Sequence, residues 1–239
     1  MRASAAFSHL SPWILRQSKF VLKRKVSYMV SFMTGRAFCA GCAILLMALS
    51  VTAQAQERVV TSLFETRRAH VVIQEWDLSC GAAALATLLR YQYGEPVTEK
   101  EVAVALMNRP EYLKHPELVQ IRQGFSLLDL KRYTDSQGYL GVATGKMELK
   151  DLLERAPIMV PINVLGYNHF VIFRGLRGNR VLLADPAWGN RTMLVSDFLD
   201  AWIDFPNLGH VGLVVKQRNG VEGPPNELAP RDMDFVTFG

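Results

Sequence analysis

The sequence predicts an α+β domain in which the helices come first along the chain and the strands follow. Between residues 79 and 155 apolar residues recur at helical spacing, whereas residues 156–217 hold short runs rich in Val, Ile, Leu and Phe that are separated by Gly, Asn and Pro. A regular alternation of strands and helices would have indicated a parallel sheet instead. The 239 residues, 49% hydrophobic and 21% charged, suffice for one globular domain with appendages.

The first 55 residues have the pattern of a secretory signal peptide. They contain no Asp or Glu, and their basic residues are Arg2, Arg16, Lys19, Lys23, Arg24, Lys25 and Arg36. An apolar run from Ala37 to Val51 follows, and the small residues Ala53 and Ala55 precede an expected cut before Gln56. We expect residues 1–55 to be removed on export to the periplasm. The alternative is an anchor that stays in the membrane, although the apolar run is shorter than the about 20 residues of a spanning helix.

The basic charge of the full chain belongs to this N-terminal segment. The chain has 27 Lys and Arg against 22 Asp and Glu, a formal charge of +5. Without the seven basic residues of the segment, 20 Lys and Arg remain against 22 Asp and Glu, so the mature chain has a formal charge of −2. The remainder has no basic stripe interleaved with aromatic residues, so the sequence gives no support to nucleic-acid binding.

The same cut changes the cysteine count. It removes Cys39 and Cys42, which leaves Cys80 as the one cysteine of the expected mature chain. An unpaired cysteine in an oxidising compartment is a liability that a packing role rarely needs. Cys80 is therefore a candidate reactive thiol or a partner in an intermolecular disulfide.

The helical half begins at this cysteine. Ser79 stands where an N-cap is expected, Thr98 and Glu101 have the pattern of a capping box, and Ser126 and Asp129 stand at the start of a third helix. Gly94 is expected to end the first helix, and residues 109–117 are expected to form a loop. The helices predicted in this half cover residues 79–93, 98–107, 126–137 and 147–155.

The second half is expected to form an antiparallel sheet. The predicted strands cover residues 156–164, 169–176, 181–186 and 210–217, with a helix at 196–203. Residues 177–180, "RGNR", are typical of a hairpin turn. The segment 218–239 is rich in Pro and Gly, and we expect it to pack loosely or not at all. The predicted organisation is thus a signal peptide (1–55), a folded domain (56–217) and a C-terminal tail (218–239).

Cys80 is well placed for chemistry. At the first turn of a helix its sulfur faces the positive end of the helix dipole and backbone amides without intrahelical partners, a setting that favours the thiolate. The apolar helix behind it would hold the sulfur rigidly. Gly81 is expected to leave space for the backbone of a substrate.

A thiolate peptidase also needs a general base and a group that orients this base. His70, His115, His169 and His210 remain after the signal segment. His169 begins a strongly apolar strand, and Asp185 closes the next one, so a hairpin would bring the carboxylate beside the ring. From the residues alone a structural histidine is equally possible at 169, and Asp-Pro after a strand is also a common turn.

Together these residues form a recognisable pattern. Gln74, then Cys-Gly-Ala-Ala opening a helix, Asn-His-Phe-Val-Ile in a strand and Ala-Asp-Pro in the next strand resemble the bacteriocin-processing, double-glycine leader peptidases. The resemblance extends over residues 70–217. It implies a papain-like cysteine peptidase fold, with Cys80 as nucleophile, His169 as general base and acid, and Asp185 as the orienting group. Gln74 would stabilise the oxyanion; without the family spacing it would be interpreted as a surface loop residue.

The resemblance has departures that bear on function. Ser79 stands where many members have Asp before the cysteine, and Asp77 lies two residues earlier. The export signal and the lack of transporter domains make the chain similar to stand-alone periplasmic members that accompany secretion or functional-amyloid systems. We therefore expect a periplasmic cysteine peptidase that needs no metal or cofactor. Its expected partner is an exported protein or peptide, such as an amyloid-like fibre subunit or a secretion-system component.

Two other interpretations remain open. The same fold could serve as a non-catalytic substrate-binding module or chaperone of a secretion system, although the presence of Cys80, His169 and Asp185 argues against it. Alternatively, Cys80 could be a buried structural residue, which an inert thiol at neutral pH would favour.

Overall fold

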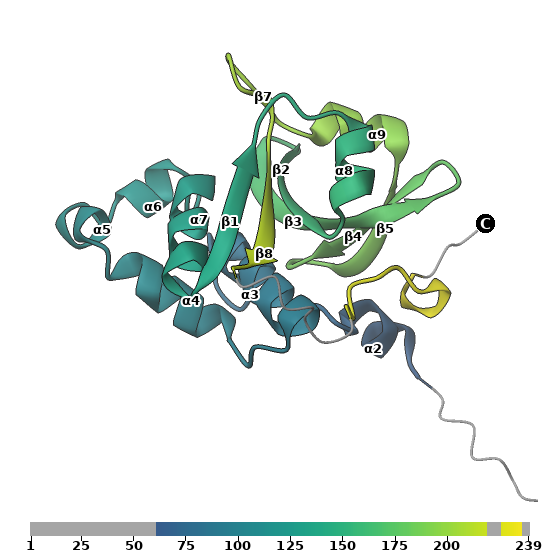
Figure 1. The fold of residues 1–239 in the computed structure, drawn as a ribbon, viewed down its shortest axis with the longest axis horizontal. Coiled ribbons are helices and arrows are strands. Elements are labelled where there is room, and N and C mark those ends of the chain that lie inside the picture. Colours follow the sequence, from purple (N-terminus) through teal and green to yellow (C-terminus); the bar gives the residue numbers. More distant parts are fainter. Residues whose placement is uncertain (1–60, 219–225, 236–239) are drawn as a thin grey trace, which may run out of the picture. The chain divides into compact units, whose positions relative to one another are not determined.

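The computed structural model describes residues 61–218 and 226–235 (Figure 1). The expected signal peptide, and with it the expected cut before Gln56, lies outside the described residues. Within the part of the chain that is described, none of the helices is both long enough and apolar enough to cross a membrane.

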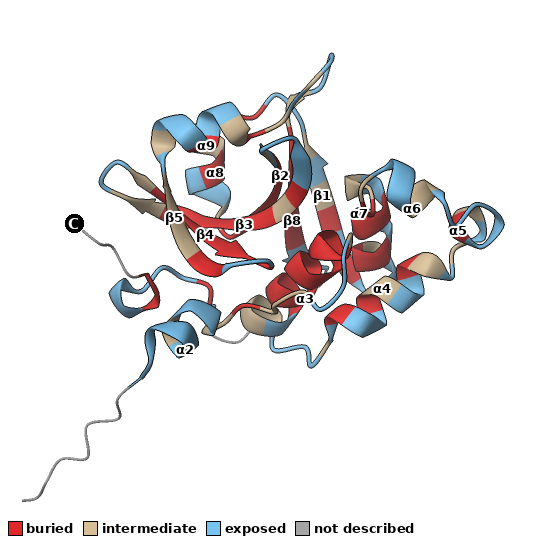
Figure 2. Ribbon diagram, turned by 180° about the vertical axis from the view of Figure 1, so that it is seen from behind, coloured by how far each residue is buried: buried red, intermediate tan, exposed pale blue. Residues whose placement is uncertain are grey.

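Helices dominate the first half of the described chain, as predicted. They are α2 (Leu63–Arg68), α3 (Cys80–Tyr93), α4 (Glu99–Met107), α5 (Pro110–Lys114), α6 (Leu118–Ile121), α7 (Leu127–Ser136) and, further on, α8 (Leu149–Arg155) and α9 (Val195–Ala201). α3 is the central helix because its residues are small or apolar on every side, and all ten residues from Cys80 to Leu89 are buried (Figure 2). It ends at Gly94, whose φ of 75° is the left-handed conformation expected of a helix terminus.

The helix starts follow the sequence signals. Thr98 caps α4 in the predicted capping box, and Ser126, predicted at the start of the third helix, caps α7 in a capping box with Asp129. Ser79 occupies the N-cap position of α3, as predicted, but its side chain makes no cap bond. Its hydroxyl lies 2.6 Å from the carbonyl oxygen of Trp76 instead. The amides of the first turn of α3 are therefore left without a side-chain cap.

Two segments that looked polar or irregular are helical. The expected loop at 109–117 contains α5 and the approach to α6, because Pro110 suits the first turn of a helix and Tyr112 is fully buried with its hydroxyl 2.5 Å from Asp129. Residues 63–68, for which no element was predicted, form the short helix α2, which begins in a capping box of Ser62 and Glu65. Ser-x-x-Glu at 62–65 was the available signal for this helix.

The second half forms an antiparallel sheet, which confirms the α+β class. Its order is β1-β8-β2-β3-β4-β5, made of β1 (Tyr139–Thr144), β8 (Gly212–Gln217), β2 (Ile158–Val164), β3 (Tyr167–Arg177), β4 (Arg180–Asp185) and β5 (Gly189–Leu194). A separate hairpin pairs β6 (Asp204–Phe205) with β7 (Gly209–His210). The sequence did not predict β1 and β5. Both are edge strands, which carry fewer inward apolar residues than central ones.

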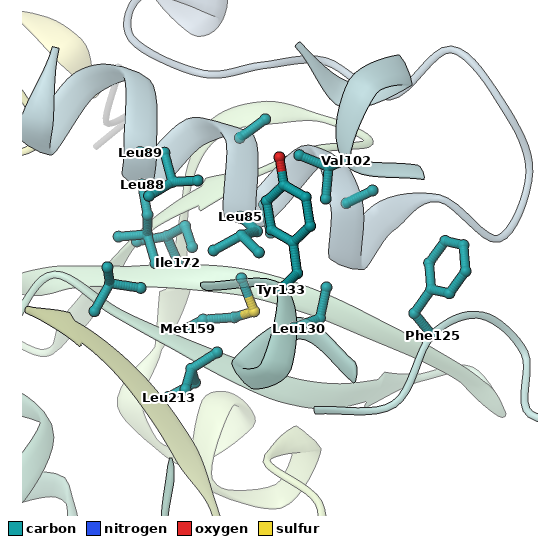
Figure 3. Packing of buried hydrophobic residues seen from close by; sticks show 14 of the residues in the cluster. Leu85, Leu88, Leu89, Val102, Phe125, Leu130, Tyr133, Met159, Ile172 and Leu213 are labelled. Atoms are coloured by element: carbon teal, nitrogen blue, oxygen red, sulfur yellow. The ribbon is translucent and has the colours of Figure 1, made fainter. Parts of the chain in front are cut away.

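The sheet has a core on each face because successive residues of a strand point to opposite sides. Met159 of β2 packs with α3 and α7, in a cluster that also contains Leu85, Leu130 and Leu213 (Figure 3). Its neighbour Val160 points to the other face, where α8 and α9 cover the second cluster. The sheet thus lies between two helical layers. One layer contains α3 and α7, and the other contains α8 and α9.

The C-terminal segment does not behave as predicted. Residues 226–235, which include a 3₁₀ turn (η1, Asp232–Asp234), pack against the sheet although the tail was expected to be loose. Leu228 is fully buried, and the buried guanidinium of Arg174 in β3 binds Asp234 at 2.7 Å and the Leu228 carbonyl at 2.8 Å. A buried charge is stable only when it is paired and hydrogen-bonded, so this segment completes the domain. Composition alone misses such a contact.

Candidate active site

Cys80 is the first residue of α3, and its side chain is buried. The helix packs closely behind it. A Cβ atom on Gly81 would lie 3.1 Å from Leu130 and 3.2 Å from Phe170. The expectation that Gly81 leaves room for a substrate was therefore wrong. The missing side chain lets α3 approach α7 and β3, and so brings Cys80 next to the strand that carries His169.

The predicted hairpin brings His169 and Asp185 together. β3 and β4 are joined by a turn at Gly178 and Asn179, within the predicted turn, and Ile172 pairs with Ala184 across the two strands. Nε2 of His169 lies 2.7 Å from Oδ1 of Asp185. Both side chains are buried, at 8% and 0% exposure, so the bond is protected from water.

Asp185 is held on both of its oxygens. Oδ1 also accepts the backbone N–H of Ala187 at 2.8 Å, and Oδ2 accepts Nε–H of Arg191 at 2.7 Å. Burial alone would raise the pKa of Asp185, but the bond to His169 and the positive charges of His169 and Arg191 outweigh burial and lower it. The carboxylate is thus ionised and fixed in orientation. Sequence reasoning missed Arg191 because it lies on β5, which was not predicted.

The ring of His169 connects this carboxylate to the thiol. Burial would lower the pKa of His169, but hydrogen bonds with Asp185 and Cys80 raise it to about 9. Because Nε2 is occupied by Asp185, Nδ1 is the ring nitrogen that remains for the sulfur. The structure therefore places the ring of His169 between the thiol of Cys80 and the carboxylate of Asp185. Its interactions with these two groups stabilise the protonated, positively charged form of the ring.

Gln74 lies beside the same turn. Its backbone N–H donates to the carbonyl of Pro186 at 2.9 Å, directly after Asp185. Its side-chain nitrogen donates to the carbonyl of Trp76 at 3.3 Å, and its side-chain oxygen is buried without a hydrogen-bond partner among the described residues. The structure thus brings Gln74 to the site, with its amide bonded within the loop that precedes Cys80. To donate to an oxyanion, the side-chain amide of Gln74 has to give up its long hydrogen bond to the Trp76 carbonyl.

Tyr167 was not predicted and also lies at the site. It is two residues before His169 on β3, so the two side chains share a face of the strand. Burial raises the pKa of Tyr167, and so do the nearby charges of Cys80 and Asp77. The phenol is therefore near the thiol. An aromatic residue two positions before a candidate histidine on the same strand was the signal in the sequence.

A pocket of about 500 Å³ begins at His169 and runs along the end of the sheet. Its walls are mainly apolar and come from the start of α7 and the residues before it, the end of β1, neighbouring parts of β2 and β3, and the β6–β7 hairpin. They include Phe125, Leu128, Phe170, Ile203, Phe205 and Leu208. Arg122 is a charged residue of the lining and is about 40% exposed on its side chain. The pocket suits apolar groups of a ligand that reaches His169.

No cluster of three or more His, Cys, Asp or Glu side chains with metal-binding geometry occurs in the ranges that the structure describes. The other candidate histidines have surroundings of their own: His115 contacts Glu117, His210 stacks on Trp202 with ring centroids 4.5 Å apart, and His70 packs edge-on against Tyr91. His169 is thus the histidine that the structure places beside Cys80. That the chemistry needs no cofactor stays a prediction.

Comparison with known proteins identifies relatives of the chain. Residues 68–205 match the Peptidase C39 family, over more than half of the chain. The chain is 35% identical over 175 residues to the "Probable functional amyloid protease FapD" of Pseudomonas aeruginosa, covering 72% of this chain and 74% of the relative. It is 36% identical over 194 residues to the protein of the same description from Pseudomonas fluorescens, covering 75% and 81%.

Solved structures of lower identity were also found. One is a double glycine motif protease from an AMS/PCAT transporter in complex with the leader peptide, at 24% identity and a TM-score of 0.49, covering 62% of this chain and 90% of that one. Another is the peptidase domain of Streptococcus ComA, at 14% identity and a TM-score of 0.49, covering 63% and 100%. On the family match and the two relatives above 30% identity, the chain belongs to the peptidase C39 family.

Proposed function

We propose that the protein is a periplasmic cysteine peptidase that cleaves an exported protein or peptide of a functional-amyloid or related secretion system. The observation that carries the proposal is the 2.7 Å bond between His169 and Asp185, placed by a hairpin next to a thiol at a helix N-terminus. The amyloid context is supported by the description of the two relatives as probable functional amyloid proteases. The periplasmic location is supported by the signal-peptide pattern of residues 1–55.

In the proposed reaction the Cys80 thiolate attacks the carbonyl carbon of the scissile peptide bond. The C–N bond breaks as Nδ1 of His169 gives its proton to the leaving amine, and an acyl thioester remains on Cys80. Water then attacks the thioester and passes a proton to His169, which releases the acid and restores the thiolate–imidazolium pair. Asp185 keeps Nε2 bonded throughout, so that Nδ1 always faces the sulfur.

Negative charge that develops on the substrate carbonyl oxygen needs donors already in place. The backbone N–H of Cys80 is one candidate, because the first turn of α3 has no side-chain cap. The amide of Gln74 is the second, since its 3.3 Å bond to Trp76 is long and readily exchanged. The two donors flank the thiol from the helix and from the loop that precedes it.

The pocket next to His169 is proposed to bind the substrate. Its apolar walls fit an amphipathic or apolar segment of the chain to be cut, and its contact with His169 sets the distance from that segment to the scissile bond. The alternative, a holder of unfolded cargo, would use the same pocket but would not need the thiol.

The decisive experiment compares wild type with Cys80→Ala in a host deleted for the gene. The new N-termini in the periplasmic fraction would be compared by mass spectrometry. A peptidase generates termini that disappear with Cys80→Ala, while the variant still co-purifies with the uncut partner. Full fibre assembly or secretion with Cys80→Ala would instead favour the holder function. Lys150→Ala, at an exposed position outside the site, is the matched control for expression and export.

A further inference from the structure

We propose that Glu99 is a positioning residue of the active site: its buried carboxylate holds the loop of residues 75–79 and thereby places Gln74 and the Cys80 amide for oxyanion binding. The inference rests on the proposed peptidase function. Glu99 is only 4% exposed, an uncommon burial for a carboxylate, which needs specific partners to be stable there.

The partners of Glu99 all belong to that loop. Its two carboxylate oxygens accept the backbone N–H of Glu75 at 2.9 and 3.2 Å, and one of them is also hydrogen-bonded to the hydroxyl of Ser79. That hydroxyl lies 2.6 Å from the carbonyl of Trp76. One side chain from α4 thus holds both ends of the short segment that separates Gln74 from Cys80.

The loop does not keep this shape unaided. Leu78 has a φ of 67°, the left-handed conformation that a branched side chain adopts only when its surroundings impose it. Its carbonyl oxygen would lie 2.9 Å from a Cβ atom on Gly124, so the loop is pressed against that glycine. The Gln74 N–H, bonded to Pro186, anchors the other side. Glu99 supplies the polar contacts that close the loop between these two points.

The position of Glu99 in its helix explains why a carboxylate serves here. It is the first residue of α4, where free backbone amides and the helix dipole favour a negative charge. α4 itself is fixed against α3 through buried Val102 and Leu106. The carboxylate is therefore held by a rigid element and acts on Gln74 and Cys80 only through the loop.

The test uses Glu99→Ala and Glu99→Gln in the full protein. The side-chain amide introduced by Glu99→Gln can still accept the Glu75 N–H and can donate to the Ser79 hydroxyl, so this variant should behave like wild type. Glu99→Ala should leave the rate of Cys80 alkylation by iodoacetamide within about twofold, because the thiol and His169 are untouched. It should weaken binding of a peptide aldehyde, acetyl-glycyl-glycinal, by about tenfold or more, because the hemithioacetal oxygen has lost correctly placed donors.

The matched control is Glu101→Ala. Glu101 lies in the same first turn of α4 and caps it through Thr98, so its loss destabilises the helix start without removing the contacts to the loop. Hydrogen exchange of the amides of residues 75–80 should be faster in Glu99→Ala and unchanged in Glu101→Ala. Equal exchange in wild type and Glu99→Ala, a parallel loss of alkylation and aldehyde binding, or a Glu99→Gln variant as impaired as Glu99→Ala would overturn the inference. A wild type that neither cleaves substrate nor binds the aldehyde would refute the peptidase function, and the exchange measurement would still decide whether Glu99 holds the loop.

Discussion

Arg191 donates from Nε to Oδ2 of Asp185 at 2.7 Å, while the other oxygen of the same carboxylate holds the ring of His169. The guanidinium comes from β5, an edge strand, and is about a quarter exposed, whereas Asp185 is fully buried. Arg191 therefore fixes the orientation of the Asp185 carboxylate, and the carboxylate in turn fixes the orientation of the His169 ring.

Arg191→Gln should lower turnover by roughly tenfold to a hundredfold, because a small rotation of Asp185 misplaces the His169 ring. Loss of the nearby positive charge should also raise the pKa of Asp185, which moves the acid side of the pH–rate profile to higher pH. Arg191→Lys should restore part of both. Arg180→Gln is the control, since Arg180 spans the same two strands but bonds Thr192. A profile whose acid side stays in place in Arg191→Gln would contradict this role.

The pH dependence should follow His169, whose pKa is raised from 6.5 to about 9. A raised pKa means that the folded protein stabilises the charged form of His169. The imidazolium therefore contributes fully to the free energy of unfolding below pH 6.5, and this contribution is lost as the pH rises through about 9. Turnover should fall over the same range because the leaving amine loses its proton donor. Alkylation of Cys80 should not fall there, since it needs no proton donor. Turnover and alkylation rates measured in parallel from about pH 6 to about pH 10 would separate the two.

Gln74→Ala should reduce turnover by roughly 10²–10³ and leave Cys80 open to alkylation, because the amide acts only on charge that develops in the transition state. His169→Ala should differ by slowing alkylation at about pH 6–7 as well, since the thiolate loses its imidazolium partner. Wild-type turnover in Gln74→Ala would show that its bond to Trp76 is not exchanged during catalysis.

Asp234→Ala should destabilise the fold by about 3 kcal/mol, because it leaves the buried Arg174 guanidinium without its counter-charge. This is the lower end of the usual range, since Asn190 and the Leu228 carbonyl still accept from Arg174. The control is Asp232→Ala, which removes the exposed partner of Arg177 and should leave the unfolding midpoint unchanged. Urea unfolding followed by tryptophan fluorescence would compare the two; equal midpoints would show that the pairing of Arg174 with Asp234 does not stabilise the fold.

Cleavage of residues 1–55 remains a prediction. Intact-mass measurement of the protein from periplasmic extract should give a chain that begins at Gln56. Replacement of Ala55 by a bulky residue should leave the segment attached and the protein in the membrane fraction. A wild-type protein that retains the segment would instead indicate a membrane-anchored peptidase.

The predictable part of the site lies in local sequence patterns. A cysteine at a helix start, and a histidine and an aspartate on the two strands of a hairpin, are signals that lie within one helix or one pair of strands. The hairpin brings the two strands together, but the register shift between Phe173 and Gly175, which the sequence did not predict, is also needed to put His169 and Asp185 on the same face of the sheet.

The residues that sequence reasoning missed depend on elements or partners that were not predicted. Arg191 lies on an edge strand with weak apolar alternation, and Glu99 was interpreted as part of a helix start. Arg174 meets Asp234 from 60 positions away. Buried charges of this kind have no local signature, since a charged residue in a sequence is expected at the surface until its partner is known.

The pairing of Arg174 with Asp234 also makes the C-terminal segment a condition for a stable active site. Arg174 and His169 lie on the same strand, so a copy clipped before Asp234 would leave an unpaired guanidinium inside the sheet that carries the site. Such a copy should unfold more readily and lose the arrangement of Cys80, His169 and Asp185. A protease that removes only the last residues of the domain would thereby switch the enzyme off.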